Sequence, residues 1–123
     1  MSRPNLKGAR ILVVEDEPLI VMDISMAFEN TGALLTSTNT VKRATLLIEH
    51  DGLTAVILDH ALSDGDCDGL CARLMKRGVP FLMHTGYPAI NGPCKGAPHL
   101  RKPSTHEEIL DAVEALIRDK ISN

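Results

Sequence analysis

Aromatic side chains are scarce in this chain of 123 residues, which has two phenylalanines, one tyrosine and no tryptophan. Few rings are available to stack on bases, so recognition of nucleic acid by stacking is not expected. Positive charge is also limited, because 13 lysines and arginines are set against 16 aspartates and glutamates, for a formal net charge of -3. Without a positive field to attract phosphates, we expect no direct nucleic-acid partner.

Long hydrophobic runs are absent as well. No apolar stretch reaches the roughly 20 residues that a membrane-spanning helix needs, and residues 1–10 do not resemble a signal peptide. We therefore expect a cytoplasmic protein that does not contact a membrane. The length suits one domain, which we expect to span residues 1–123 with its core at about 9–121.

Cysteine is limited to Cys67, Cys71 and Cys94. An odd number, in a chain long enough to fold without cross-links, favours reduced thiols over a disulfide framework. Cys67 and Cys71 are four residues apart, which would place them on one face of a helix. We interpret them as small buried side chains, and a metal site is the less favoured alternative.

Short apolar runs alternate with helical patterns along the chain. Runs rich in β-branched residues predict strands buried on both faces at residues 10–14, 54–58 and 79–83, with a more polar edge strand at 33–37 and a short strand at about 99–101. Helical spacing predicts helices at 17–30, at about 41–51, from near 68 to a stop at Gly78, and from 104 onward. Ser104 and Glu107 suit a capping box for the last helix. The alternation predicts an α/β fold with a doubly wound parallel sheet.

The segment 86–98 interrupts this alternation. It contains three glycines and three prolines, a density that no regular helix tolerates. We therefore expect the fourth helix to be short or irregular.

Polar side chains follow the predicted strands at the edge where ligands bind in open parallel sheets. Glu15 and Asp16 follow the first strand, Asp59 the third and Thr85 the fourth, and Lys102 follows the last. Crowded carboxylates favour a hard divalent cation such as Mg2+, and Mn2+ is possible. With a hydroxyl and an ammonium nearby, the set suits phosphoryl transfer, and Asp59 is best placed to be the nucleophile.

These residues lie in segments that resemble the receiver domain of bacterial response regulators. The segments are ILVVEDEP, AVILDH, MHTGY and RKP, and with their spacing the resemblance covers essentially the whole chain. It implies a flavodoxin-like five-stranded sheet in the order 2-1-3-4-5. It also implies that Asp59 is the phosphoacceptor, and that Glu15, Asp16, Asp59 and the backbone carbonyl of Ala61 hold Mg2+.

The resemblance assigns the phosphate-binding and switch roles to Thr85 and Lys102. It further implies a cis peptide bond between Lys102 and Pro103. One position departs from the pattern, because Leu100 stands where the family usually has a switch aromatic. Tyr87, two residues after Thr85, could take over that role, or the segment 86–98 could become ordered on phosphorylation instead.

The resemblance also implies partners. A histidine kinase or a histidine phosphotransfer protein would donate the phosphoryl group from a phosphohistidine. The chain would then be a signalling protein that assists its own phosphorylation and dephosphorylation, not an enzyme. Its output would be a switched protein-binding face or a role as a phosphate sink. The alternative is a pseudo-receiver, an interaction module that works without phosphorylation.

The run PFLMHTGY and its glycine- and proline-rich continuation resemble the FATGUY branch of receivers, which are often stand-alone. The usual dimer face of the family includes the fourth helix. Because we expect this helix to be short or irregular here, we expect a monomer.

A calcium loop is a competing interpretation of the acidic segment 64–69. Asp64, Asp66 and Asp68 match the first half of an EF-hand loop, but its twelfth position is Met75, where a bidentate glutamate is needed. We therefore favour helix capping and a solvated acidic loop over calcium binding.

Overall fold

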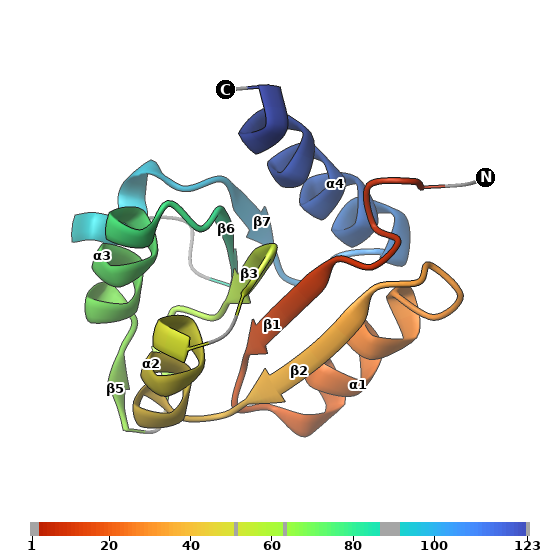
Figure 1. The fold of residues 1–123 in the computed structure, drawn as a ribbon. Helices are drawn as coiled ribbons and strands as arrows, with labels where there is room; N and C mark the ends of the chain where they lie inside the picture. Colours follow the sequence, from red (N-terminus) through yellow and green to blue (C-terminus); the bar gives the residue numbers. More distant parts are fainter. Residues whose placement is uncertain (1–2, 51, 63, 87–91, 123) are drawn as a thin grey trace.

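A parallel sheet forms the centre of the molecule (Figure 1). The computed structural model describes residues 3–50, 52–62, 64–86 and 92–122. The strands of the sheet are β1 (Arg10–Val14), β2 (Leu34–Thr38), β3 (Ala55–Leu58), β6 (Phe81–Thr85) and β7 (His99–Arg101). They run parallel in the order β2-β1-β3-β6-β7, which is the order 2-1-3-4-5 when these five strands are counted along the chain. The predicted flavodoxin-like α/β fold is confirmed.

Helices cover both faces of this sheet (Figure 1). They are α1 (Pro18–Ala27), α2 (Val41–His50), α3 (Asp68–Arg77) and α4 (His106–Ser122). α1 packs beside α4 on one face, and α2 beside α3 on the other. Successive side chains of β1 point to opposite faces, so Ile11 and Val13 join the first layer and Leu12 and Val14 the second. Burial on both faces explains why the central strands are continuously apolar.

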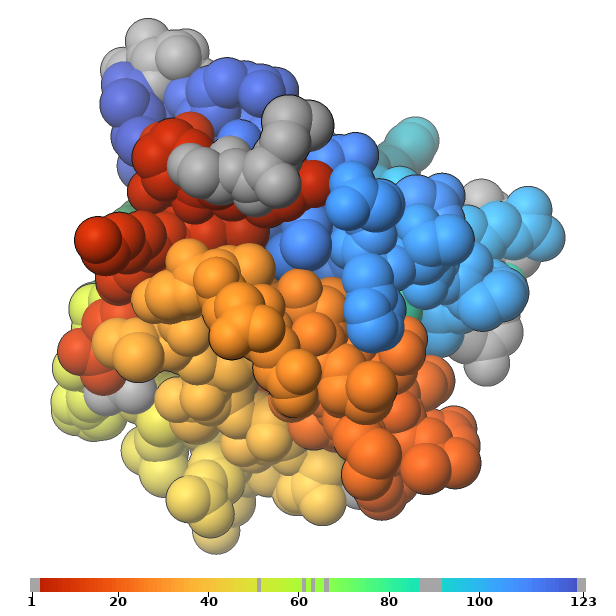
Figure 2. Space-filling model, turned by 90° about the vertical axis from the view of Figure 1, so that its right-hand side faces the viewer, coloured from red at the N-terminus to blue at the C-terminus, as the bar shows by residue number. Residues whose placement is uncertain are grey.

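The segment before β1 is part of the fold. Leu6 is fully buried in the layer formed by α1 and α4. Arg3 forms ion pairs with three acidic residues of α4, Glu107, Asp111 and Glu114. Figure 2 shows the N-terminal segment lying against the C-terminal helix. Within the described part of the chain, no helix has the length and apolar character that crossing a membrane requires.

Several element boundaries differ from the prediction by one to three residues. The strand predicted at 79–83 begins at Phe81, because the Val79 amide still donates to the carbonyl of Leu74 at the end of α3. Gly78 ends that helix as predicted, with a φ of 69° that glycine adopts without steric cost. The first helix ends at Ala27, three residues earlier than predicted.

The capping box of the last helix lies one residue later than predicted. The Thr105 amide donates to Oε1 of Glu108 at 2.8 Å, and the Glu108 amide donates to Oγ1 of Thr105 at 3.1 Å. Ser104 instead donates its hydroxyl to the carbonyl of Arg101 at 2.7 Å. The assignment to Ser104 and Glu107 was wrong because the pair Thr105 and Glu108 has the same three-residue spacing.

The acidic segment after β3 caps a helix. It contains the short antiparallel strands β4 (Ala61–Leu62) and β5 (Gly65–Asp66), which were not predicted. Asp64 Oδ1 accepts the Val41 amide at 2.7 Å, and Oδ2 accepts the Lys42 amide at 3.2 Å. These hydrogen bonds lower the pKa of Asp64. The capping role favoured over calcium binding therefore applies to α2.

The fourth connection holds only a short 3-10 helix, η1 (Gly92–Gly96), among its described residues. This agrees with the prediction that the fourth helix is short or irregular.

The prediction of reduced thiols was wrong for two of the cysteines, because Cys71 of α3 and Cys94 of η1 form a disulfide. Parity of the cysteine count carries no information on which two sulfurs a fold brings together.

Candidate functional site

Three carboxylates meet beyond the carboxyl ends of β1 and β3. Glu15 and Asp16 follow β1, and Asp59 follows β3. The ladder between these neighbouring strands continues to the site, since the Asp59 amide donates to the carbonyl of Val14 at 2.9 Å. Carboxylate oxygens of the three side chains lie within 4.8 Å of one another. The structure thus brings together the acidic residues that the sequence singled out.

Lys102 reaches this cluster from the end of β7. Its Nζ lies 2.7 Å from Oε1 of Glu15 and 3.2 Å from Oδ1 of Asp59. The Lys102 amide donates to the carbonyl of Thr85 at 2.9 Å, which ties the end of β7 to the end of β6. The peptide bond between Lys102 and Pro103 is cis, as expected. The pairing of Lys102 with Glu15 was not anticipated from the sequence, which gives no distances between strand ends.

Burial shapes the charges of the cluster. Glu15 and Asp59 are buried at 3% and 7% exposure, whereas Asp16 is exposed. Burial raises the pKa of Glu15, even though a hydrogen bond from Lys102 acts in the opposite direction. Burial acts to lower the pKa of Lys102, but its hydrogen bond to Glu15 and the charges of Asp59 and Glu15 leave this pKa raised. The lysine is therefore held firmly in its charged form.

The carboxylates fit a divalent cation. Three of them converge, two are buried, and one ammonium group contacts two of them. Negative charge remains in excess, and oxygen is the donor atom that Mg2+ prefers. A pocket lined in part by Glu15, Asp16 and Thr38 opens beside the cluster. Ala61 stands two residues after Asp59, at the start of β4.

The remaining predicted residues lie around this cluster. Thr85 ends β6, the strand next to β3, and is buried at 2% exposure. Leu100 is partly buried and packs against the layer formed by α1 and α4. Tyr87 lies outside the described residues, so its role as a switch aromatic stays a prediction.

His84 occupies the opposite face of β6 from Thr85. It is buried, and neither ring nitrogen has a hydrogen-bond partner among the described residues. Burial lowers the pKa of His84, and the charge of Lys102 adds to this effect. A neutral ring is favoured there.

No family model matches the chain. Among curated proteins, the transcriptional regulatory protein TcrA of Mycobacterium tuberculosis is 31% identical over 120 residues, which cover 92% of this chain. The chain spans about half the length of TcrA, with 47% of that protein covered.

Solved structures share the fold over nearly the whole chain. SdrG from Sphingomonas melonis Fr1 is 30% identical, with a TM-score of 0.78 and coverage of 95% of this chain and 99% of that one. A CheY-like response regulator receiver domain protein from Methanospirillum hungatei JF-1 has 19% identity and a TM-score of 0.84, over 94% and 98% of the two chains. The receiver domain of a sensor histidine kinase from Pseudomonas aeruginosa PAO1, with magnesium coordinated in its active-site cleft, has 24% identity and a TM-score of 0.79, over 90% and 98%.

The sheet order, the acidic cluster and these likenesses lead to one assignment. The chain belongs to the CheY-like receiver domains of response regulators. Membership in this family supports a phosphoacceptor role in two-component signalling.

Proposed function

We propose that Asp59 accepts a phosphoryl group from the phosphohistidine of a sensor kinase or a histidine phosphotransfer protein. The observation that carries this proposal is the convergence of Glu15, Asp16 and Lys102 around the Asp59 carboxylate. In the transfer, a carboxylate oxygen of Asp59 forms a bond to phosphorus and the bond from phosphorus to the imidazole nitrogen breaks. The imidazole keeps the bonding electron pair, and Asp59 becomes an acyl phosphate. Water later hydrolyses the acyl phosphate and releases inorganic phosphate.

Mg2+ would be held by Glu15, Asp16, Asp59 and the backbone carbonyl of Ala61. When bound, the ion neutralises charge on the phosphoryl oxygens and on the crowded carboxylates. Mn2+, which also prefers oxygen ligands, fits the same donors. The magnesium in the related kinase receiver supports this assignment.

Lys102 and Thr85 would contact the phosphoryl group. Lys102 already touches the Asp59 carboxylate, so its ammonium group is close to where a phosphoryl oxygen would be added. Thr85 offers a hydroxyl from the next strand, at the same edge of the sheet. With Leu100 in place of the usual aromatic, we expect the response to act through Thr85 and the connection that follows it.

Two outputs are compatible with the proposed phosphoacceptor role. A change at Thr85 would alter a protein-binding face, and a chain without a bound target would instead drain phosphoryl groups from a kinase. We propose that the domain spans residues 1–123, acts as a monomer and meets its kinase in the cytoplasm. The runner-up is a pseudo-receiver, and the presence of Leu100 is the observation that favours it.

Intact mass after incubation with Mg2+ and acetyl phosphate tests the proposal. The unaltered chain should gain the mass of one phosphoryl group, and omission of Mg2+ should abolish the gain. Asp59→Asn should not gain it, whereas Asp119→Asn, which changes an exposed aspartate of α4, should behave like the unaltered chain. If acetyl phosphate, a phosphohistidine donor and beryllofluoride all fail to react or bind, the pseudo-receiver becomes the better assignment.

A further inference from the structure

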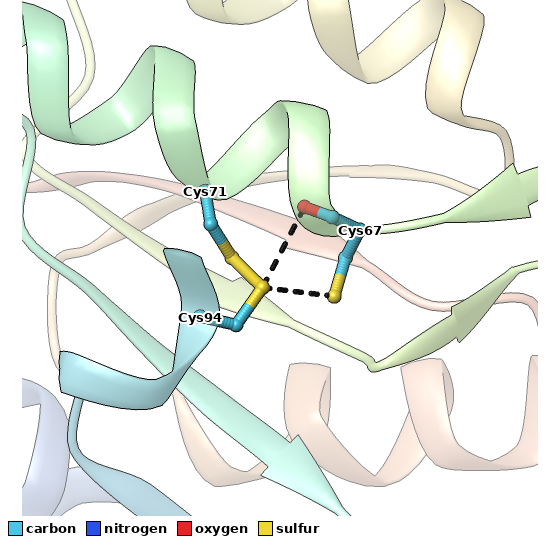
Figure 3. Close-up of side chains that lie close together, drawn as sticks. All are labelled: Cys67, Cys71 and Cys94. Atoms are coloured by element: carbon cyan, nitrogen blue, oxygen red, sulfur yellow. Dashed lines mark hydrogen bonds between the residues drawn. A yellow bond between two sulfur atoms is a disulfide. The ribbon is translucent and has the colours of Figure 1, made fainter. Parts of the chain in front are cut away.

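Three buried cysteines form a cluster apart from the acidic site. Cys67 directly precedes α3, Cys71 lies on its second turn, and Cys94 lies in η1. All three side chains are fully buried. Cys71 and Cys94 form the disulfide, and Sγ of Cys67 lies 3.2 Å from Sγ of Cys94 (Figure 3).

Helix geometry places the sulfurs of Cys67 and Cys71 against the sulfur of Cys94. The Cys71 amide donates to the carbonyl of Cys67 at 2.9 Å, which aligns these residues one turn apart on one face. Cys94 faces both of them from η1, as Figure 3 shows. A thiol in direct contact with a disulfide sulfur is the arrangement from which thiol–disulfide exchange proceeds.

We propose that Cys67, Cys71 and Cys94 form an internal thiol–disulfide exchange centre in which Cys94 alternates between two partners. The Cys67 thiolate attacks Sγ of Cys94, a new sulfur–sulfur bond forms, and the bond to Cys71 breaks. Cys71 leaves with the bonding electron pair and takes up the proton that Cys67 lost. One disulfide and one thiol are present before and after, so the exchange needs no oxidant.

The surroundings also suit the fully reduced state. Sγ of Cys94 lies 3.7 Å from the carbonyl oxygen of Cys67 and 3.7 Å from Oδ1 of Asp68. Both oxygens can accept a weak hydrogen bond from a Cys94 thiol after a dithiol has reduced the disulfide. In that reaction the disulfide gains two electrons and two protons, and the dithiol becomes a disulfide.

The Cys71–Cys94 disulfide joins η1 to α3, and η1 lies in the chain between two residues of the acidic site. η1 lies between Thr85, which ends β6, and Lys102, which follows β7. η1 packs closely against α3, since a Cβ added at Gly92 would lie 3.4 Å from Oδ2 of Asp68. Reduction would release this connection from α3. The exchange itself does not depend on the phosphoacceptor role proposed above.

A soft metal ion is the alternative occupant of three cysteine sulfurs. The disulfide engages two of the three sulfurs, which then cannot act as thiolate ligands. The observed bonding therefore favours exchange, and Zn2+ binding becomes one outcome of the test.

The test is disulfide mapping on the full chain. The protein is equilibrated at pH 8 with oxidised and reduced glutathione, its thiols are alkylated, and it is digested with pepsin at low pH to stop exchange. Leu70 offers a cleavage position between Cys67 and Cys71. The unaltered chain should yield both the Cys71–Cys94 and the Cys67–Cys94 pair, with the first in excess.

Single variants assign the partners. Cys71→Ser should form the Cys67–Cys94 disulfide, and Cys67→Ser should form only Cys71–Cys94. Cys94→Ser should leave both remaining thiols open to alkylation after unfolding, because side chains one helical turn apart, with Cβ atoms about 5–6 Å apart, do not meet the geometry of a disulfide.

Detection of Cys71–Cys94 alone in the unaltered chain would overturn the proposal, as would a folded Cys71→Ser variant with two free thiols. If Cys71→Ser does not fold, the map of the unaltered chain decides. A one-to-one Zn2+ complex of the reduced chain that resists oxidation by glutathione would also overturn it.

Discussion

Lys102 lies closer to Glu15 than to Asp59, with Nζ distances of 2.7 Å and 3.2 Å. Glu15 is the more buried of the two carboxylates, at 3% exposure. The lysine thus compensates a carboxylate that burial would otherwise penalise, and it also occupies space among the candidate metal ligands. A Mg2+ ion bound by these carboxylates would therefore compete with Lys102 for the same negative charge.

Lys102→Ala should bind Mg2+ more tightly than the unaltered chain. The substitution removes a positive charge that repels the ion and pairs with two of its candidate ligands. A gain of about tenfold corresponds to roughly 1.4 kcal/mol, which is in the range of one charge interaction at this partial exposure. Isothermal titration calorimetry with MgCl2 measures it, with the exposed Lys120→Ala as control. Equal or weaker binding by Lys102→Ala would show that the lysine does not compete with the ion.

Glu15→Gln should stabilise the metal-free chain at neutral pH. The folded-state pKa of Glu15 is raised, so ionisation is disfavoured in the folded state. This cost is absent below the unfolded pKa, grows as pH rises through the folded pKa and is complete above it. The stability difference between variant and unaltered chain should therefore appear between acid and neutral pH. Urea unfolding in EDTA from pH 4 to 8, with exposed Glu29→Gln as control, measures it. A variant that is less stable at neutral pH would mean that the lost bond to Lys102 outweighs the burial cost.

The sheet and its acidic edge were predictable because they depend on local pattern and on a general rule of topology. β1 and β3 are short, apolar and bounded by polar residues, and parallel strands place their carboxyl ends at one edge. Glu15, Asp16 and Asp59 could therefore be grouped without knowing any distance.

Other features depend on contacts between distant segments, which spacing alone does not fix. Asp64 caps α2 across 23 residues of sequence, and no local motif points to that helix. Cys71 and Cys94 are likewise joined across 23 residues, through the irregular connection. The shift of the capping box to Thr105 has a simpler cause, since Ser104 and Thr105 each precede a glutamate by three residues.

Asp64→Ala should destabilise the chain, and calcium should not reverse the loss. The substitution removes acceptors for the amides of Val41 and Lys42 at the start of α2. The pKa of Asp64 is lowered in the folded state, so this contribution is present above the unfolded pKa and is lost as pH falls through the folded pKa. Thermal unfolding followed by circular dichroism should show a lower Tm at pH 7 and a smaller difference near pH 3. A rise in the Tm of the unaltered chain on addition of CaCl2, absent in the variant, would favour the calcium loop instead.

Reduction of the Cys71–Cys94 disulfide should lower the free energy of unfolding by about 3 kcal/mol, the value expected for closing a loop of this size in the unfolded chain. The loop spans 23 residues, and the alternative Cys67–Cys94 loop spans 27. Because the entropy of closure depends only on the logarithm of loop length, oxidised Cys71→Ser should lose a similar amount on reduction. Urea unfolding with and without dithiothreitol measures both differences. Cys94→Ser cannot form either loop, so dithiothreitol should not change its free energy of unfolding. If Cys94→Ser is as stable as the oxidised unaltered chain, the cross-link contributes nothing, and the packing of η1 against α3 alone holds this connection in place.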